Sequence, residues 1–381
     1  MSLSIYRLDR DLILAENRIR EAQYSNDLKA SLLEFEDYLF SEGLSVARIL
    51  KYMTMANVIA TQFPNIDYRN LSETNLIQII GWIERNKKNG NTKNSYKYTL
   101  RKLLAWQKKE DHISKVKINP NVTKTKLPEE MFTETDIKNM IIHAENPRDR
   151  AFIAVLYETG SRISEHGNPQ IKHAVFDKYG ASIIENGKTG MRRIRIVWSV
   201  QYLIAWINIH PMKGDPEAPL WVTLQKPIEH LKYDAICRMI KRTAKKAGIQ
   251  KRVHNHLFRH SRCTHVANTL SESQMKPYFG WTSDSKMPKI YIHLSGEDVD
   301  NAILNIYGLK KTESEKIKLN ILSCPRCKQT IPDISEFCPA CGMVLTLEAS
   351  QRLQELETLA IDKMVYLLKK YPELSDIFKE I

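Results

Sequence analysis

His256 and Arg259 form a His-x-x-Arg motif, whose residue types and spacing suit a catalytic site. One helical turn would present both side chains toward the same point. A histidine that shares a proton and an arginine that binds an oxyanion suit phosphoryl transfer. The chain contains 11 histidines, so chance also produces such pairs. The nearby Cys263 has no second cysteine at metal-ligand spacing.

Two further cations stand where a side chain can reach a phosphate. Arg162, in TGSRISE, follows the expected end of one helix, and Glu165 lies three residues later on the same face. Lys188, in ENGKTG, is at the tip of a predicted β-hairpin. Each has an ordinary alternative, because Arg162 also suits a surface ion pair and Lys188 a solvent-exposed turn.

One tyrosine, Tyr291, lies in the polar stretch GWTSDSKMPKIYIHLS. A tyrosine in a globular protein is usually a packed ring whose hydroxyl finds a partner. Considered alone, this stretch therefore favours a packed Tyr291 over a nucleophilic one.

The order of these residues along the chain changes that interpretation. Together they resemble the tyrosine recombinase (phage integrase) family over about residues 130–310. The stretch SKMPKIYIHLSGEDVDNAIL resembles archaeal integrases and Xer-type relatives more than bacterial ones. The residues that carry the resemblance are, in order, Arg162, Lys188, His256, Arg259, Trp281 and Tyr291.

The resemblance implies roles for the groups around the phosphate. Tyr291 would attack the scissile phosphate, leaving a 3′-phosphotyrosyl link and a free 5′-hydroxyl. Arg162 and Arg259 would bind the non-bridging oxygens. His256 would hydrogen-bond the phosphate and help with the tyrosine proton, and Lys188 would protonate the leaving oxygen. Neither a metal nor a nucleotide is expected at this centre.

The resemblance also implies supporting groups, and it has two departures. Trp281 stands where many relatives have histidine, and its indole N–H can donate to a phosphate oxygen. Glu165 and His260 would orient the side chains that bind the phosphate, without contacting the phosphate themselves. Trp281 and Tyr291 are ten residues apart, where nine is the common spacing in the family. The segment SEHGNPQIKH lacks the usual leucine-rich run.

Four clustered cysteines form a second, independent motif. Two CxxC units separated by ten residues are typical of a tetrahedral S₄ zinc site, with an iron centre as the alternative. Four filled positions leave no room for a substrate, so we expect a structural zinc ribbon. It resembles ribbons at the C-terminus of some archaeal integrases. The expected ligands are Cys324, Cys327, Cys338 and Cys341.

The elements that hold these residues suggest a multidomain protein. Residues 1–120 are expected to be an all-α core-binding (SAM-like) DNA-binding domain, followed by a linker at 121–131. Residues 132–310 are expected to be an α+β catalytic domain, mainly helical with a small antiparallel sheet. The zinc ribbon (322–345) and an amphipathic helix (346–381) complete the chain. The face of that helix would cover a second subunit or pack back on the ribbon.

One N-terminal helix, NTKNSYKYTLRKLLAWQKKE, places three basic residues on one face. These residues, Lys93, Lys97 and Arg101, suit a helix lying on a DNA backbone, or a solvated surface. Tyr96, Leu100 and Leu103 line an adjacent face that can pack inward.

Composition fits a polyanionic partner. The net charge is +13, and residues 322–381 hold 7 basic and 9 acidic groups, so the first 321 residues carry the whole surplus. A generally basic proteome is the alternative explanation. With no signal peptide or membrane span expected, we predict a cytoplasmic, nucleoid-associated protein.

These observations predict a site-specific recombinase or integrase of a mobile element that acts on double-stranded DNA, as a homotetramer assembled there. A type IB topoisomerase-like nicking-closing enzyme is one alternative. A zinc-ribbon DNA-binding regulator with an inactive catalytic domain is another.

Overall fold

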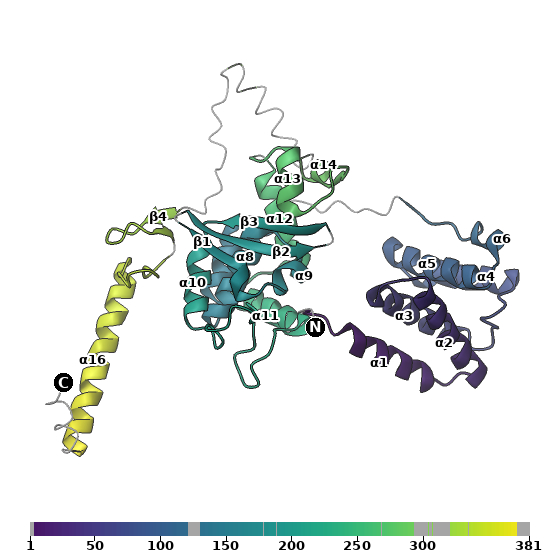
Figure 1. Ribbon diagram of the computed structural model, residues 1–381, viewed down its shortest axis with the longest axis horizontal. Helices are drawn as coiled ribbons and strands as arrows, with labels where there is room; N and C mark the ends of the chain where they lie inside the picture. Colours follow the sequence, from purple (N-terminus) through teal and green to yellow (C-terminus); the bar gives the residue numbers. More distant parts are fainter. Residues whose placement is uncertain are drawn as a thin grey trace. The chain divides into compact units, whose positions relative to one another are not determined.

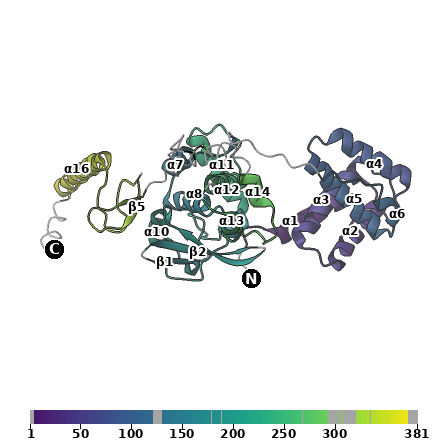
Figure 2. The same ribbon diagram turned by 90° about the horizontal axis from the view of Figure 1, so that it is seen from above.

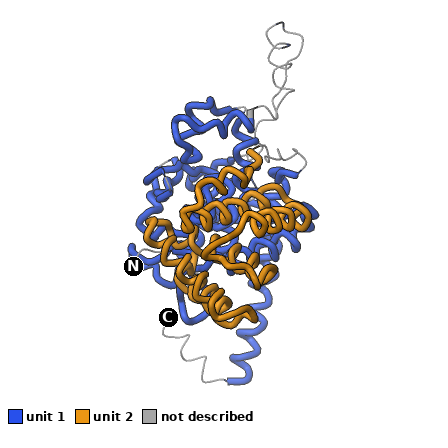
Figure 3. Tube along the Cα trace, turned by 90° about the vertical axis from the view of Figure 1, so that its right-hand side faces the viewer, with its two compact units in different colours: residues 1–5, 126–381 blue, residues 6–125 orange. Residues whose placement is uncertain are grey.

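The computed structural model describes residues 4–120, 130–177, 179–187, 189–267, 269–292, 304, 307, 321–333 and 335–371. The chain divides into two compact units (Figure 3). One consists of residues 6–125, and the other of residues 1–5 with 126–381.

The smaller unit is entirely helical in its described residues, and its helices surround one core. The ends of its helices follow from local sequence, since the Ser72 hydroxyl accepts a bond from the Asn75 N–H at the start of α4. Asn89 caps α5 in the same way. The helices are α1 (Leu8–Arg20), α2 (Asn26–Ser41), α3 (Val46–Gln62), α4 (Glu73–Asn86), α5 (Gly90–Trp106) and α6 (Glu110–Ile113).

The larger unit is built around α8 (Pro147–Thr159), whose residues from Ala151 onward are all buried. A helix that is buried all round must be covered on every side. Accordingly, α8 packs against helices and a strand (Figures 1 and 2). These neighbours are α7 (Glu134–Ile142), α10 (Val200–Asn208), α12 (Asn255–Val266) and β3 (Gly190–Ile196).

A three-stranded antiparallel sheet lies on one side of α8 (Figure 1). Its strands are β1 (Ala174–Asp177), β2 (Gly180–Gly187) and β3, in that order. Strands β2 and β3 form the predicted hairpin, with Gly187 paired to Gly190. The remaining elements of this region are α9 (Ile163–Gly167), the 3₁₀ turn Ile171–His173, α11 (Tyr233–Lys246), α13 (Glu272–Phe279) and α14 (Met287–Ile292).

The C-terminal region contains a two-stranded antiparallel sheet and a long helix. Strands β4 (Ile321–Ser323) and β5 (Thr330–Pro332) lie around the first CxxC unit. Helix α16 (Leu347–Lys370) follows, capped by the Thr346 hydroxyl. Among the described residues, no helix has the combined length and apolar character that a bilayer span requires.

The expected fold, mainly helical with a small antiparallel sheet, is confirmed. Two local elements, helix α1 and strand β1, were not singled out in the sequence. In α1 the buried Leu12, Ala15 and Ile19 are separated by charged residues of the outer face, which conceals the stripe.

Candidate active site and cysteine cluster

The turn between α8 and α9 positions Arg162. Gly160 ends α8 with a φ of 58°, in the left-handed region that favours glycine. A Cβ there would lie 2.5 Å from the Phe279 ring. Two residues later, the Arg162 backbone N–H donates to Glu165 Oε2 at 3.2 Å, and Arg162 Nη1 donates to Glu165 Oε1 at 2.7 Å. Glu165 therefore orients both the backbone and the guanidinium of Arg162.

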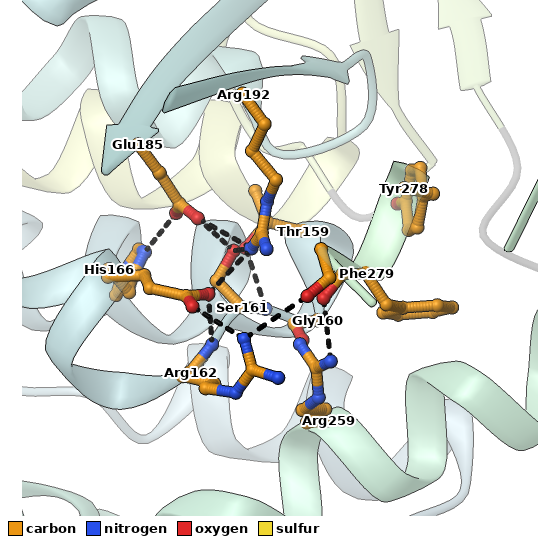
Figure 4. Close-up of polar contacts among 12 residues, drawn as sticks. Thr159, Gly160, Ser161, Arg162, His166, Glu185, Arg192, Arg259, Tyr278 and Phe279 are labelled. Atoms are coloured by element: carbon orange, nitrogen blue, oxygen red, sulfur yellow. Dashed lines mark hydrogen bonds and ion pairs between the residues drawn. The ribbon is translucent and has the colours of Figure 1, made fainter. Parts of the chain in front are cut away.

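Arg259 comes from α12 and meets Arg162 at one backbone segment (Figure 4). Its Nη1 donates to the Gly160 carbonyl at 3.0 Å, and its Nη2 donates to the Phe279 carbonyl at 2.7 Å. Arg162 Nη1 lies 3.5 Å from the next carbonyl, that of Gly280. Burial lowers the pKa of Arg259 to about 10, so its guanidinium stays charged at neutral pH. The geometry thus brings two permanent cations together.

Arg192, which was not singled out in the sequence, links the groups behind these arginines. It lies on β3 directly opposite Glu185 of β2. Its Nη2 donates to Glu165 Oε2 at 2.8 Å, to Glu185 Oε2 at 2.9 Å and to Ser161 Oγ at 3.0 Å (Figure 4). The Ser161 hydroxyl itself donates to Glu185. The sequence did contain a signal for Arg192. It lies on the same inward face of β3 as Ile194 and Ile196, because the three residues occupy every second position of the strand.

The charge on Glu165 follows from this network. Burial would raise the pKa of its carboxyl, but Arg192 and Arg162 outweigh burial, and the pKa lies below its usual value. Glu165 is therefore an anion at neutral pH, held by two cations.

Tyr291, on α14, is packed and hydrogen-bonded. It is 3% exposed, and its hydroxyl lies 2.6 Å from His260 Nδ1. Its ring stacks on Trp281, with ring centroids 5.9 Å apart and an interplanar angle of 12°. Burial, and then the neighbouring Cys263, raise the pKa of Tyr291, whereas Arg259 acts in the opposite direction. The hydroxyl is therefore protonated at neutral pH in this conformation.

Trp281 and the histidines of α12 connect Tyr291 to the arginines. The Arg259 guanidinium carbon lies 5.3 Å from the centroid of the Trp281 ring, and Trp281 stacks on Tyr291. His256 lies one helical turn before His260, with ring centroids 6.0 Å apart. His260 Nδ1 lies within hydrogen-bond distance of the tyrosine hydroxyl. A shallow pocket beside Trp281 is lined in part by Lys276, Ser271 and Ser283.

The predicted Lys188 lies outside the described residues, but its two neighbours lie at the site. A Cβ on Gly187 would be 2.5 Å from Glu165 Oε1. The Thr189 hydroxyl donates to the Gly280 carbonyl at 3.4 Å, the same carbonyl that Arg162 approaches. Gly187 and Thr189, on the two sides of the hairpin tip, therefore both lie close to the site of the arginines.

The three basic residues predicted on α5 make contacts within their own unit. Lys93 and Lys97 pair with the two oxygens of Glu84 at 2.6 Å and 2.7 Å, and Lys97 is buried. Arg101 Nε donates to the Val116 carbonyl at 2.9 Å. Their role in DNA binding stays a prediction. The neighbouring Tyr96, Leu100 and Leu103 are buried as expected.

The four predicted cysteine ligands come together. All four sulfurs lie within 4.8 Å of one another, with Cys324–Cys341 at 3.7 Å and Cys327–Cys338 at 3.5 Å. Zinc–sulfur bonds of about 2.3 Å in a tetrahedron put sulfurs about 3.8 Å apart, whereas a disulfide needs about 2.05 Å. The donor set and its spacing therefore fit a tetrahedral metal ion.

The two CxxC units have the same backbone form. After each second cysteine, Lys328 and Gly342 take a positive φ, 61° and 70°. The amides of these two residues donate back to the carbonyls of Cys324 and Cys338. Backbone N–H groups, that of Cys327 first, lower the pKa of the Cys324 thiol to about 6. At Cys327 the Gln329 N–H acts in the same direction, but burial and the neighbouring thiols outweigh it and raise the pKa to about 12.

Comparison with known sequences agrees with this geometry. A model of the phage integrase family matches residues 130–298. Tyrosine recombinase XerA of Pyrococcus furiosus is 34% identical over 152 residues, covering 39% of this chain and 51% of that protein. XerA of Pyrococcus horikoshii is 27% identical over 251 residues, covering 65% and 82%. The match to the first of these relatives thus spans about half of its length.

Solved structures show the same fold. XerH recombinase bound to a palindromic difH substrate aligns with a TM-score of 0.55 at 15% identity, covering 81% of this chain and 100% of that one. A lambda integrase dimer bound to a COC′ core site aligns with a TM-score of 0.56 at 16% identity, covering 72% and 79%. Residues 130–298 thus match the model of the phage integrase family, and the relatives that this chain resembles are tyrosine recombinases.

Proposed function

We propose that this protein is a site-specific DNA recombinase that cuts and rejoins double-stranded DNA through a 3′-phosphotyrosyl intermediate on Tyr291. The observation that carries the proposal is the convergence of Arg162 and Arg259 on the carbonyls of Phe279 and Gly280. That segment leads directly into Trp281, which stacks on Tyr291. One site thus contains two cations and a tyrosine. None of the groups proposed to act there is a carboxylate or thiol nucleophile.

The proposed reaction conserves phosphate esters. The Tyr291 oxygen bonds to phosphorus while the bond from phosphorus to the 5′-oxygen breaks. A histidine takes the tyrosine proton, and Lys188 gives a proton to the leaving 5′-oxygen. Rejoining reverses these steps with the 5′-hydroxyl of another strand, so no nucleotide cofactor is consumed.

Each of the remaining groups has a proposed part. Arg162 and Arg259 bind the non-bridging oxygens, whose charge is greatest in the transition state. Trp281 donates its indole N–H to the phosphate, and Glu165 orients Arg162. His256 bonds the phosphate, as the family resemblance implies. His260 is the better placed acceptor for the tyrosine proton, because of its 2.6 Å contact with the hydroxyl.

The domain arrangement that we propose is the one expected from the sequence. We propose that residues 1–120 form a core-binding domain, residues 132–310 the catalytic domain, and residues 322–345 a zinc ribbon. The surplus positive charge of the first 321 residues supports binding to a DNA backbone. A lambda integrase tetramer is known bound to a Holliday junction, and we propose a homotetramer on DNA for this protein as well. Its place would be the nucleoid.

Zinc is the metal we propose for the cysteine cluster. Cys324, Cys327, Cys338 and Cys341 would hold it as four thiolates. When bound, the ion supplies folding free energy to the ribbon and no catalytic chemistry, because all four positions are filled.

A recombination assay separates this proposal from its alternatives. A plasmid carrying two copies of the cognate site should give exchanged products with the wild type and none with the Tyr291→Phe variant. Relaxation of plasmids without such sites, with no exchange, would instead indicate a topoisomerase-like enzyme. DNA binding without any cleavage would indicate a regulator.

A further inference from the structure

Helix α16 exposes an apolar face that nothing in the described part of the chain covers. It has 24 residues, so it is about 36 Å long, and Ala349 is its one buried residue. Near its start, the helix is joined to the ribbon by an ion pair between Arg352, in its second turn, and Glu336 at 2.5 Å. In the described residues, therefore, the helix as a whole does not pack back on the ribbon.

The apolar face runs the length of the helix. Its central stripe follows the 3.6-residue helical period over five turns, and a second stripe lies beside it. Leu356 is 63% exposed and Ile361 is 58% exposed, values far above those of core residues. The central stripe contains Leu353, Leu356, Ala360, Met364, Leu367 and Tyr371, and the second contains Ile361, Val365 and Leu368.

The charges of α16 are divided between its two halves. The first half, residues 347–358, has three acidic groups and one basic group. The second half, residues 359–370, has three basic groups and one acidic group. The acidic residues are Glu348, Glu355, Glu357 and Asp362, and the basic residues are Arg352, Lys363, Lys369 and Lys370. Each half is therefore complementary in charge to the other half of an identical helix.

We propose that α16 binds α16 of a second copy of this chain in an antiparallel pair, in the absence of DNA. An antiparallel arrangement sets the acidic half of each helix against the basic half of its partner and buries both apolar faces. A parallel pair would set like charges together. The pairing does not depend on the proposed recombinase activity.

The charge balance argues against a membrane as the occupant. Helices that lie on anionic membranes carry an excess of lysine and arginine on their polar face. The helix α16 has as many acidic as basic residues, so it lacks that electrostatic attraction. A second copy of the helix would cover the apolar face and would pair each acidic half with a basic half.

Sedimentation equilibrium of the full-length chain without DNA tests the proposal. We expect a wild-type dimer, and a dissociation constant at least about 100-fold larger for the Leu356→Glu/Met364→Glu variant, because each helix would bury two charges in the interface. The matched control is Gln351→Glu/Tyr366→Glu, which adds the same charge, one in each half of the helix, on the side away from both stripes and should remain dimeric. Circular dichroism and zinc content verify that each variant is folded.

The salt dependence of the dimer tests the orientation. Screening weakens an antiparallel pair and strengthens a parallel one, so raising the salt from about 0.05 M to about 0.3 M should weaken the wild-type dimer. A monomeric wild type at micromolar concentration would overturn the proposal. So would a Leu356→Glu/Met364→Glu dimer as tight as the wild type, or a dimer that salt strengthens.

Discussion

The Nδ1 atom of His260 lies 2.6 Å from the hydroxyl of Tyr291, whose side chain is almost fully buried. This contact joins the proposed nucleophile to a proton acceptor on α12, one turn after His256. Because burial raises the pKa of Tyr291, the hydroxyl cannot ionise at neutral pH by itself. Activation therefore requires a neighbouring base, and a change in environment when DNA is bound.

Removal of that base should slow strand cleavage. We expect His260→Ala to lower the single-turnover rate of covalent adduct formation by about 10². The loss should diminish at high pH, where ionisation of the tyrosine no longer needs a base. The His256→Ala variant provides the comparison, since its proposed contact is with the phosphate. Cleavage by His260→Ala at the wild-type rate over the whole pH range would exclude a role for His260 in proton transfer.

Arg192 should affect cleavage although it is not proposed to touch DNA at the scissile phosphate. It holds Glu165, which orients Arg162, so Arg192→Ala should lower the cleavage rate at saturating DNA by about 10-fold or more, with DNA affinity little changed. Partial rescue by Arg192→Lys would show that the charge on Glu165 matters. The control is Arg193→Ala, because Arg193 lies on the opposite face of β3. Equal rates for the Arg192 and Arg193 variants would contradict this positioning role.

The cysteine cluster should bind one metal ion per chain. We expect elemental analysis to find zinc in the wild type and in Cys237→Ser, and to find it lost from Cys338→Ser. The ribbon of the latter should become sensitive to protease, whereas adduct formation at Tyr291 should persist, because no cluster cysteine belongs to the proposed catalytic set. Retention of zinc by Cys338→Ser would refute the assignment.

Glu36 should make the smaller unit less stable at neutral pH than in mild acid. Burial, and then Glu16 and Asp37, raise the pKa of Glu36 to about 7. The folded-state pKa is above the unfolded value, so the stability it supports is complete below about pH 4.5 and is lost as pH rises through about 7. Glu36→Gln should therefore raise the free energy of unfolding by about 2 kcal/mol at about pH 8, and by little at about pH 5.

Urea unfolding of the full-length chain at both pH values measures this effect. The Glu21→Gln variant, at an exposed position whose carboxyl is not among the groups that raise the pKa of Glu36, is the control for a general loss of negative charge. An equal effect of Glu36→Gln at the two pH values would contradict the proposed shift.

Much of the fold was predictable because its signals are local. The helical stripes of α2–α5, the Gly-bounded hairpin and the CxxC spacing each lie within about twenty residues, and all three are present. Strand β1 was not predicted because it has four residues, mostly exposed, and its pairing with β2 supplies the structure that its own sequence does not specify.

Contacts between distant segments were harder to predict. Arg192 meets Glu185 only through the strand register, and Ser161 only through the end of α8. Lys97 was expected to face outward, but Glu84 of the preceding helix attracts it inward. The partner of Tyr291 depends on how α12 packs against α14, which no spacing of residues in the sequence reveals.

Mapping the covalent adduct tests the central claim most directly. The protein would be incubated with a pool of random-sequence duplexes, adducts trapped with denaturant, and the modified peptide identified by mass spectrometry. The account predicts a DNA 3′-phosphate on Tyr291 and no adduct from Tyr291→Phe, with losses of about 10² to 10³ in rate for Arg162→Ala or Arg259→Ala. An adduct on another residue, or one that persists in Tyr291→Phe, would contradict it.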